Sequence, residues 1–185
     1  YAKGVVDARV FQWLHDTATR LGVPLLVDPK SPDFMRYLGA TVITPNAHEF
    51  LAAAGAPVDL EHDAAVLVAA ERVALRAQVA NLVITLGARG MAVWSSGQPL
   101  VRVAATARRV FDVTGAGDTV MATLALGLVA GLSLVEAAEL ANRAAGLAVE
   151  RPGAALITAS ELARAFPPPE RVLGAIGRTE LEARL

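Results

Sequence analysis

The residues best suited to chemistry lie between Phe111 and Thr119, where two glycines and two carboxylates directly precede a long apolar stretch. Gly115 and Gly117 carry no Cβ, so a ligand can approach the backbone closely there. Free N–H groups at the start of a helix favour an anion. Asp118 lies beside them as a possible proton acceptor, and Asp112 stands at the other end of the turn. The segment therefore predicts a phosphate site.

These residues also have a simpler interpretation. The two glycines could only make a tight turn, and Asp118 could only cap the next helix, as Asp commonly does. For Gly-Ala-Gly alone the simpler interpretation is preferable. The longer string, together with three other polar segments, favours the phosphate site.

The elements that must position these residues follow a β-α-β-α-β pattern. Short apolar strands are predicted at 23–27, 40–43 and 82–85, and helices at about 6–21, 34–38, 47–54 and 61–79. Such alternation indicates an α/β fold, with a mostly parallel sheet covered by helices on both faces. An antiparallel portion is predicted next, with strands at 91–94, 100–103 and 108–111. Helices are then expected over about 117–130 and 134–150, the second with a Ser133/Glu136 capping box, and from near Ser160.

Polar segments follow the predicted parallel strands, at 28–30, 46–49 and 85–90. Sheets of this kind bind ligands at the carboxyl ends of their strands, so these segments should gather near the glycine turn. Asn46 and Glu49 are three residues apart, share one face of a helix and could hold a water or a metal ion. The alternative is a capped helix with an exposed Glu.

The glycines at 87 and 90 are spaced for a turn after a strand, which could be a plain connection. The segment is not a P-loop, because no Gly-Lys-Ser/Thr follows.

Composition narrows the class of protein. The chain has 185 residues, 54% hydrophobic residues and a net charge of −1, which is enough for a sizeable core and offers no basic surface for nucleic acid. It has no cysteine, which excludes disulfides and thiolate metal sites and suits the cytoplasm. The uncharged run 119–135 is short for a bilayer span and contains two glycines, so we expect a buried core helix and no membrane partner.

The string Asp112-Val-Thr-Gly-Ala-Gly-Asp118 resembles the signature of the ribokinase or pfkB family of sugar kinases, an Asp-Thr-Gly-Ala-Gly-Asp element that closes the active site. Val113 stands between the Asp and the Thr of that pattern. The resemblance implies a ribokinase-like fold that binds ATP and Mg²⁺. Asp118 would accept the proton of the attacking hydroxyl, and Asp112 would help to bind a monovalent cation, often K⁺. The N–H groups that would hold the transferring phosphoryl belong to Gly115, Ala116 and Gly117.

The resemblance also assigns the nucleotide side of the site. The family's Asn-x-x-Glu element orders Mg²⁺ near the phosphates, which points to Glu49. Asn142 matches a residue near the adenine, although a mid-helix Asn can instead be a packing polar group. The positions expected to line the nucleotide are Asn46, Thr85, Gly87, Gly90 and Asn142.

Within the family, the chain is most similar to the heptose-phosphate kinases of lipopolysaccharide-precursor synthesis, through residues 1–4, 27–30, 40–46 and 110–118. The implied reaction is phosphorylation of the anomeric hydroxyl of D-glycero-D-manno-heptose 7-phosphate by ATP. Lys3 and Lys30 would contact a phosphate of the sugar, or they are ordinary surface lysines. Two alternatives stay open: another sugar or sugar-phosphate kinase of the family, and a non-catalytic nucleotide-binding module.

The resemblance extends to about residue 166 and matches the later part of the kinase domain. We expect the family's N-terminal part, with its sugar-binding elements and the β lid that often forms a homodimer contact, to be missing. Residues 167–185 are predicted to be a polar linker or tail, similar to the connector to a nucleotidyltransferase domain.

Overall fold

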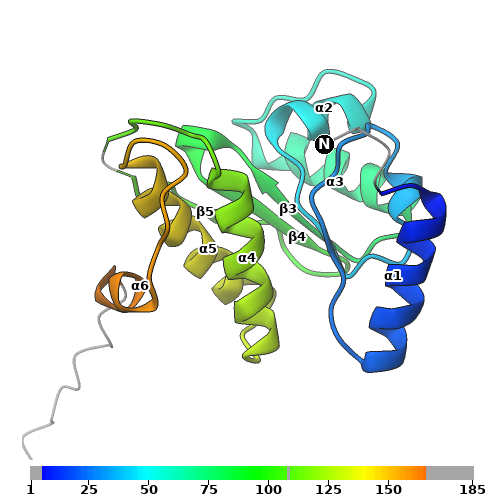
Figure 1. The fold of residues 1–185 in the computed structure, drawn as a ribbon. Coiled ribbons are helices and arrows are strands. Elements are labelled where there is room, and N and C mark those ends of the chain that lie inside the picture. The colour runs from blue at the N-terminus through cyan, green and yellow to red at the C-terminus, as the bar shows by residue number, and fades with distance from the viewer. Residues whose placement is uncertain (1–5, 108, 166–185) are drawn as a thin grey trace, which may run out of the picture.

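The structure is a computed structural model that describes residues 6–107 and 109–165. A five-stranded sheet forms its centre, and helices cover both faces (Figure 1). The strands are β1 (Leu26–Val27), β2 (Val42–Ile43), β3 (Asn81–Thr85), β4 (Met91–Ser95) and β5 (Val101–Val103). The helices are α1 (Ala8–Leu21), α2 (Ala47–Ala54), α3 (Asp63–Ala77), α4 (Ala116–Val129), α5 (Leu134–Val149) and α6 (Ala159–Ala165), with 3₁₀ turns η1 (Phe34–Tyr37) and η2 (Gly87–Arg89).

The sheet confirms the predicted mixture of parallel and antiparallel strands. Strands β1, β2 and β3 are parallel neighbours, and β4 and β5 continue the sheet in antiparallel order. Strand β1 is shorter than predicted because Pro24 has no N–H and the N–H of Leu25 donates to the hydroxyl of Thr41, 2.8 Å away. The polar tail predicted at 167–185 lies outside the described residues.

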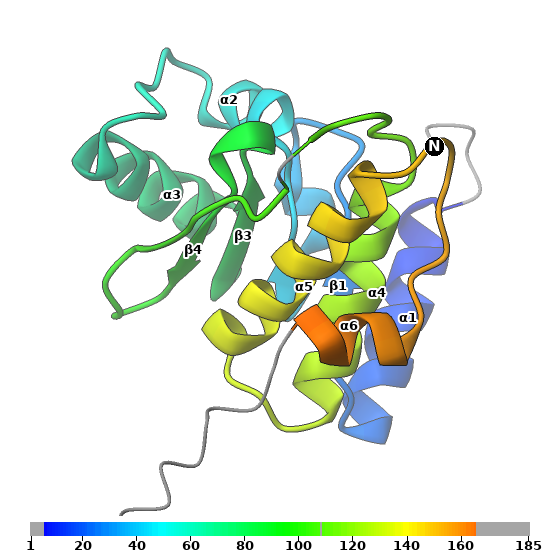
Figure 2. The same cartoon turned by 90° about the vertical axis from the view of Figure 1, so that its left-hand side faces the viewer.

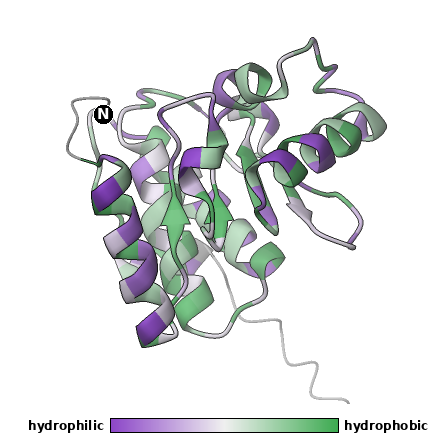
Figure 3. Ribbon diagram, turned by 90° about the vertical axis from the view of Figure 1, so that its right-hand side faces the viewer, coloured by the Kyte–Doolittle hydropathy of each residue, from purple (hydrophilic) through white to green (hydrophobic). Residues whose placement is uncertain are grey.

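Alternation along β3 divides the core into two clusters. Leu82 and Ile84 face α1, α2 and α3, whereas Val83 faces α4 and α5, and all three are fully buried. A side-chain period of two produces this separation. Figure 3 shows hydrophobic strands between helices of mixed hydropathy, and α1 carries its polar residues on its outer side. The sheet is therefore covered on both faces, as the strand pattern predicts.

The predicted strand at 108–111 is wrong for residues 109–111, and residue 108 lies outside the described residues. The N–H groups of Phe111 and Asp112 both donate to the carbonyl of Val149, at 2.7 and 3.3 Å. Because these donors bond to the end of α5, they are not available to a sheet ladder. The segment runs instead as a loop into the glycine turn.

The uncharged run 119–135 is also not a single buried helix. Helix α4 ends at Val129, the chain turns through Gly131 with φ of +87°, and α5 starts at Leu134. Leu126 and Val129 are each 71% exposed. No helix among the described residues is long and apolar enough to cross a bilayer.

Several predicted helix ends are confirmed. Gly22 ends α1 and Gly55 ends α2, both in the left-handed conformation, with φ of +65° and +67°. Ser133 and Glu136 form the expected capping box at the start of α5. These ends depend on local sequence, which is why the sequence predicts them.

Gly90→Ala should destabilise the protein more than Gly97→Ala. Both glycines have positive φ, but a Cβ at Gly90 would collide with the carbonyl oxygen of Val103 and lie 2.6 Å from the nitrogen of Ala105, whereas Gly97 has open space. We expect Gly90→Ala to cost at least about 3 kcal/mol and Gly97→Ala about 1 to 2 kcal/mol. Free energies of unfolding from urea titrations test this, and equal losses would contradict it.

Candidate active site

Three of the predicted polar segments start at one edge of the sheet. Asp28 follows β1, Asn46 follows β2 and Thr85 ends β3, and these strands are parallel. Backbone bonds hold the strand ends in line. The N–H of Thr44 donates to Val27 over 2.8 Å, and the N–H of Thr85 donates to Pro45 over 2.9 Å. The carboxyl ends of β1, β2 and β3 therefore share one edge.

The glycine turn reaches the same edge through the first half of α4. The buried hydroxyl of Thr44 lies 3.3 Å from the carbonyl of Val27 and 3.0 Å from the sulfur of Met121. Met121 is three residues after Asp118, on α4. Figures 1 and 2 both show α2 and the first turn of α4 at the same end of the molecule. The structure thus brings the predicted segments together.

The start of α4 leaves backbone groups open to a ligand. Gly115, with φ of +78°, is the N-cap residue, and no side chain caps the helix. A Cβ on Gly117 would meet no atom within 4 Å, so nothing obstructs the backbone there. The N–H of Ala116 donates to Val113 at 3.2 Å. The first-turn N–H groups of Gly117 and Asp118 have no carbonyl four residues earlier within the helix.

Asp118 lies in the first turn of α4, three residues after the N-cap, and its side chain makes no capping bond. The residue is exposed. The simpler interpretation, in which Asp118 only caps α4, is therefore wrong. The helix instead presents a solvent-accessible carboxylate beside its own open N–H groups.

Asp112 fastens the glycine turn to the loop that follows α5. Its two carboxylate oxygens accept the N–H groups of Thr114 at 2.9 Å and Gly153 at 3.1 Å. Hydrogen bonds from the side chain and backbone of Thr114, and then from Gly153, lower the pKa of Asp112. Gly115 in turn approaches Ala154, because an added Cβ would lie 3.4 Å from that residue's Cβ. The loop after α5 therefore supports the turn that carries the site.

The start of α2 is held by a reciprocal cap. The N–H of Glu49 donates to Asn46 at 2.9 Å, and the N–H of Asn46 donates to Glu49 at 2.8 Å. The side chain of Glu49 is only 15% exposed, and its other oxygen lies 3.4 Å from the ammonium of Lys30. The cap is present as the alternative interpretation has it, but Glu49 does not extend freely into solvent.

The glycines of the segment 85–90 have different surroundings. Gly87, with φ of +61°, would carry a Cβ into open space, whereas Gly90 packs against the end of β5. The N–H of Leu86 donates to Gly90 at 2.8 Å, and that of Gly90 to Gly87 at 2.9 Å. Gly87 is therefore open to a ligand next to Thr85, and Gly90 is required by the close approach of two strands.

Asn142 is buried, and its amide donates to the carbonyl of Ala104 at 2.7 Å. The backbone carbonyl of Asn142 accepts a hydrogen bond from the hydroxyl of Thr106 at 3.4 Å. Gly146, one turn later, allows this loop to approach, because a Cβ there would lie 2.6 Å from the Thr106 hydroxyl. These contacts fit the packing alternative, and a contact of Asn142 with adenine stays a prediction.

Lys3 lies outside the described residues, so its phosphate contact stays a prediction. The described residues contain no group of three or more His, Cys, Asp or Glu side chains arranged to hold a metal ion. Mg²⁺ commonly takes only one or two carboxylates and completes its shell with water and substrate phosphates. Glu49 at the sheet edge fits that pattern.

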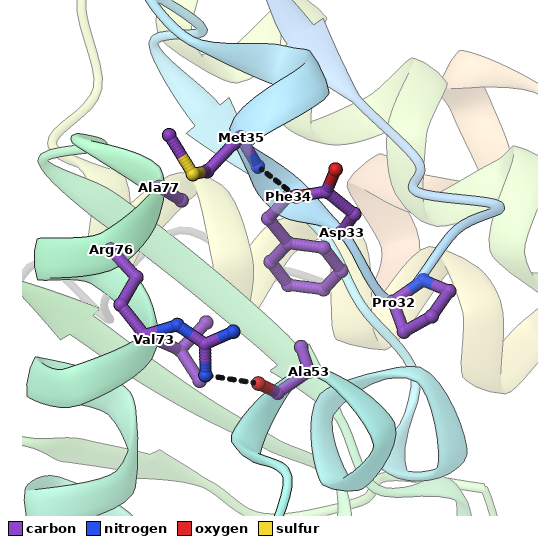
Figure 4. Close-up of a pocket in the computed structure, with 8 residues that line it drawn as sticks. All are labelled: Pro32, Asp33, Phe34, Met35, Ala53, Val73, Arg76 and Ala77. Carbon is purple, nitrogen blue, oxygen red and sulfur yellow. Dashed lines mark hydrogen bonds between the residues drawn. The ribbon is translucent and has the colours of Figure 1, made fainter.

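A small cavity lies elsewhere, between η1, α2 and α3 (Figure 4). The guanidinium of Arg76 borders it and donates to the carbonyl of Ala53 at 3.3 Å. None of the predicted site residues lines it, so we assign it no part in the site.

Two residues that position the predicted segments were not expected from the sequence. The hydroxyl of Thr44 joins β2 to α4, and the N–H of Gly153 donates to the carboxylate of Asp112. A Thr at the end of an apolar strand is the only local signal for the first. No local signal marks the second, because its partner is 41 residues away in sequence.

Comparison with known proteins agrees with this geometry. A profile of the pfkB family carbohydrate kinases matches residues 2–161. The chain is 44% identical over 162 residues to the bifunctional protein HldE of Trichlorobacter lovleyi, and 46% identical over 162 residues to that of Caulobacter vibrioides. Each match covers 88% of this chain and 33% of the relative. The chain thus spans about a third of the length of these relatives.

Solved structures define the class of fold. Arabidopsis thaliana ribokinase, complexed with ribose and ATP, matches with a TM-score of 0.77 at 24% identity, over 88% of this chain and 54% of the ribokinase. Escherichia coli phosphofructokinase-2, in complex with potassium, matches with a TM-score of 0.72 at 20% identity, over 86% and 52%. The fold is ribokinase-like. The chain belongs to the pfkB family of carbohydrate kinases.

The loop that supports Asp112 is closed by an ion pair. Glu161 accepts Arg151 at 2.6 Å through one oxygen and the N–H and hydroxyl of Thr158 through the other. Arg151 first, and then Thr158, lower the pKa of Glu161 from 4.5 to about 2.

Because the folded-state pKa is depressed, the contribution of Glu161 to stability is complete above about pH 4.5 and is lost as the pH falls toward 2. The difference in unfolding free energy between the wild type and Glu161→Gln should therefore shrink across that range. Urea titrations at a series of pH values measure it. A difference that stays constant with pH would contradict the pairing.

Proposed function

We propose that the protein transfers the γ-phosphoryl group of ATP to a sugar hydroxyl. The observation that carries the proposal is the exposed carboxylate of Asp118 beside the open N–H groups at the start of α4. Phosphoryl transfer needs a proton acceptor and donors for the charge of the moving group, and these two features supply both. Membership of a carbohydrate kinase family supports the same reaction.

Each group has a defined task in this mechanism. Asp118 accepts the proton of the attacking hydroxyl. The N–H groups of Gly115, Ala116 and Gly117 hold the phosphoryl at the positive end of the α4 dipole. The N–H of Ala116 would give up its hydrogen bond to the carbonyl of Val113 and donate to the phosphoryl group instead. The first turn of α4 would thus hold the transferring phosphoryl group next to the carboxylate that takes the proton.

The other predicted residues serve the nucleotide and the ions. Mg²⁺, when bound, neutralises charge on the nucleotide phosphates, and Glu49 would hold its water shell. Asp112 would contribute to a site for K⁺. The backbone at Gly87 is open for a phosphate, whereas Gly90 would shape that loop by its packing. The residues proposed to line the nucleotide are Asn46, Thr85, Gly87, Gly90 and Asn142.

We propose D-glycero-D-manno-heptose 7-phosphate as the sugar and its anomeric hydroxyl as the acceptor. Support comes from the similarity of residues 27–30, 40–46 and 110–118 to heptose-phosphate kinases, and from identities of 44% and 46% to proteins named HldE. Lys3 would contact the 7-phosphate, whereas the Lys30 ammonium already pairs with Asp28 and Glu49. A homodimer in the cytoplasm is proposed for the full-length protein.

ADP release with Mg-ATP and a panel of sugars tests this function. We expect turnover with heptose 7-phosphate and none with ribose, fructose or fructose 6-phosphate. Activity on another sugar would support the proposed kinase activity and reject heptose 7-phosphate as the substrate. Saturable ATP binding with no turnover on any sugar would favour a non-catalytic nucleotide-binding module.

Asp118→Asn should lower turnover by about 10² to 10⁴-fold and leave ATP affinity largely unchanged, because it removes the proton acceptor at nearly constant volume. ADP release and nucleotide titration measure the two quantities. Glu71→Gln, which neutralises an exposed carboxylate on α3, is the matched control and should keep full activity. Normal turnover of Asp118→Asn would reject the assignment of the base.

Glu49→Gln should raise the Mg²⁺ concentration needed for half-maximal turnover by about tenfold. The chain provides a matched control in Glu136, which occupies the same capping-box position on α5. Glu136→Gln makes the same change at the equivalent position of the other capping box and should leave the Mg²⁺ requirement unchanged. Equal Mg²⁺ titrations for the two variants would mean that Glu49 is only a cap.

A further inference from the structure

Lys30 forms an ion cluster between two segments of the site. Its ammonium lies 2.8 Å from a carboxylate oxygen of Asp28 and 3.4 Å from one of Glu49. The side chains of Lys30 and Asp28 are 38% and 31% exposed, and that of Glu49 is 15% exposed. The ammonium therefore bridges the end of β1 and the start of α2.

The backbone of Lys30 is anchored to the hydrophobic core. Its N–H donates to the hydroxyl of Tyr37 at 3.1 Å. The ring of Tyr37 packs edge-on against Phe11, with 5.7 Å between the ring centres, and Pro29 is fully buried. A lysine on a mobile loop would sample many positions, whereas this one starts from a fixed backbone.

The cluster contains one positive and two negative charges. Burial is the largest single influence on Lys30 and lowers its pKa, but the hydrogen bonds and charges of Asp28 and Glu49 together outweigh it and raise the pKa above its ordinary value. The ammonium stays charged at neutral pH. A group with net negative charge is a poor receptor for a phosphate, so these contacts indicate a task for Lys30 toward the carboxylates.

Both oxygens of Glu49 are engaged. One accepts the N–H of Asn46 at 2.8 Å and the other faces Lys30. A cation that approaches Glu49 must therefore compete with the ammonium, unless it brings further negative ligands. The phosphates of a nucleotide are such ligands.

We infer that Lys30 is a positioning residue that holds Asp28 and Glu49 together and occupies the cation position between them, so that a divalent ion binds at Glu49 only in company with nucleotide phosphates. The inference rests on the proposed function for the identity of the phosphate ligand. Its physical content, competition between an ammonium and a divalent cation for the same two carboxylates, does not require turnover.

Mn²⁺ binding to the full-length protein without nucleotide or sugar, followed by electron paramagnetic resonance, tests the inference. Lys30→Met keeps most of the aliphatic stem and removes the charge, so it should bind free Mn²⁺ at least about tenfold more tightly than the wild type. Lys30→Gln is a second neutral variant with the same expected gain. Lys30→Arg should behave as the wild type, because it retains the cation.

Two further variants separate this competition from a general change in charge. Asp28→Asn combined with Lys30→Met should lose the gain, because one of the two carboxylates is then neutral. Arg102→Met removes a cation paired with Asp63 at 2.8 Å, outside the four site segments, and should show no gain. Unchanged Mn²⁺ affinity in both neutral Lys30 variants, or an equal gain in Arg102→Met, would overturn the inference.

The outcome is independent of the kinase proposal. If Mn²⁺ binding changes as expected but no sugar is phosphorylated, the competition stands and the proposed function fails. If sugars are phosphorylated and free Mn²⁺ binding does not change, the kinase stands and this inference fails. In that case a raised KM for the sugar phosphate in Lys30→Met would assign Lys30 to the substrate.

Discussion

The parallel pairing of β1, β2 and β3 is the constraint on which the site depends. It brings Asp28, Asn46 and Thr85 to one edge of the sheet, although they come from widely separated parts of the chain. The buried hydroxyl of Thr44 then joins this edge to Met121, and so to the helix that carries Asp118. A phosphate held at the start of α4 is consequently close to the strand ends. The fold thus explains how polar residues that are distant in sequence come together at one end of the sheet.

Two helices begin with the same capping box, but their surroundings give the boxes different roles. On α5, Glu136 bonds only to Ser133 in the contacts found within the described residues, and it serves the helix end. On α2, Glu49 makes the equivalent bond and also faces the Lys30 ammonium at the sheet edge. Glu49 is therefore a candidate ligand because of the residues around it. The two capping boxes have the same local pattern and differ in what packs against them.

Prediction from sequence succeeds where a structure depends on neighbouring residues. The left-handed glycines, the capping boxes and the alternation of strands and helices follow from local patterns, and they predict the sheet edge at which the site forms. The predicted strand at 109–111 fails because of a distant partner, since the N–H of Phe111 donates to Val149. The hydrogen bond from Asn142 to Ala104 also joins residues far apart in sequence. The ion pair of Lys30 and Glu49 spans 19 residues. No local pattern specifies such contacts.

The proposed function requires the glycine turn and the sheet edge to bind nucleotide phosphates together. Hydrogen exchange of the full-length protein, with and without a non-hydrolysable ATP analogue and Mg²⁺, tests it most directly. We predict slower amide exchange in residues 114–118 and 85–90 when the analogue is bound, and no change in residues 33–35 beside the cavity between η1 and α3. Protection confined to the cavity, or none in the glycine turn under saturating analogue, would contradict the account.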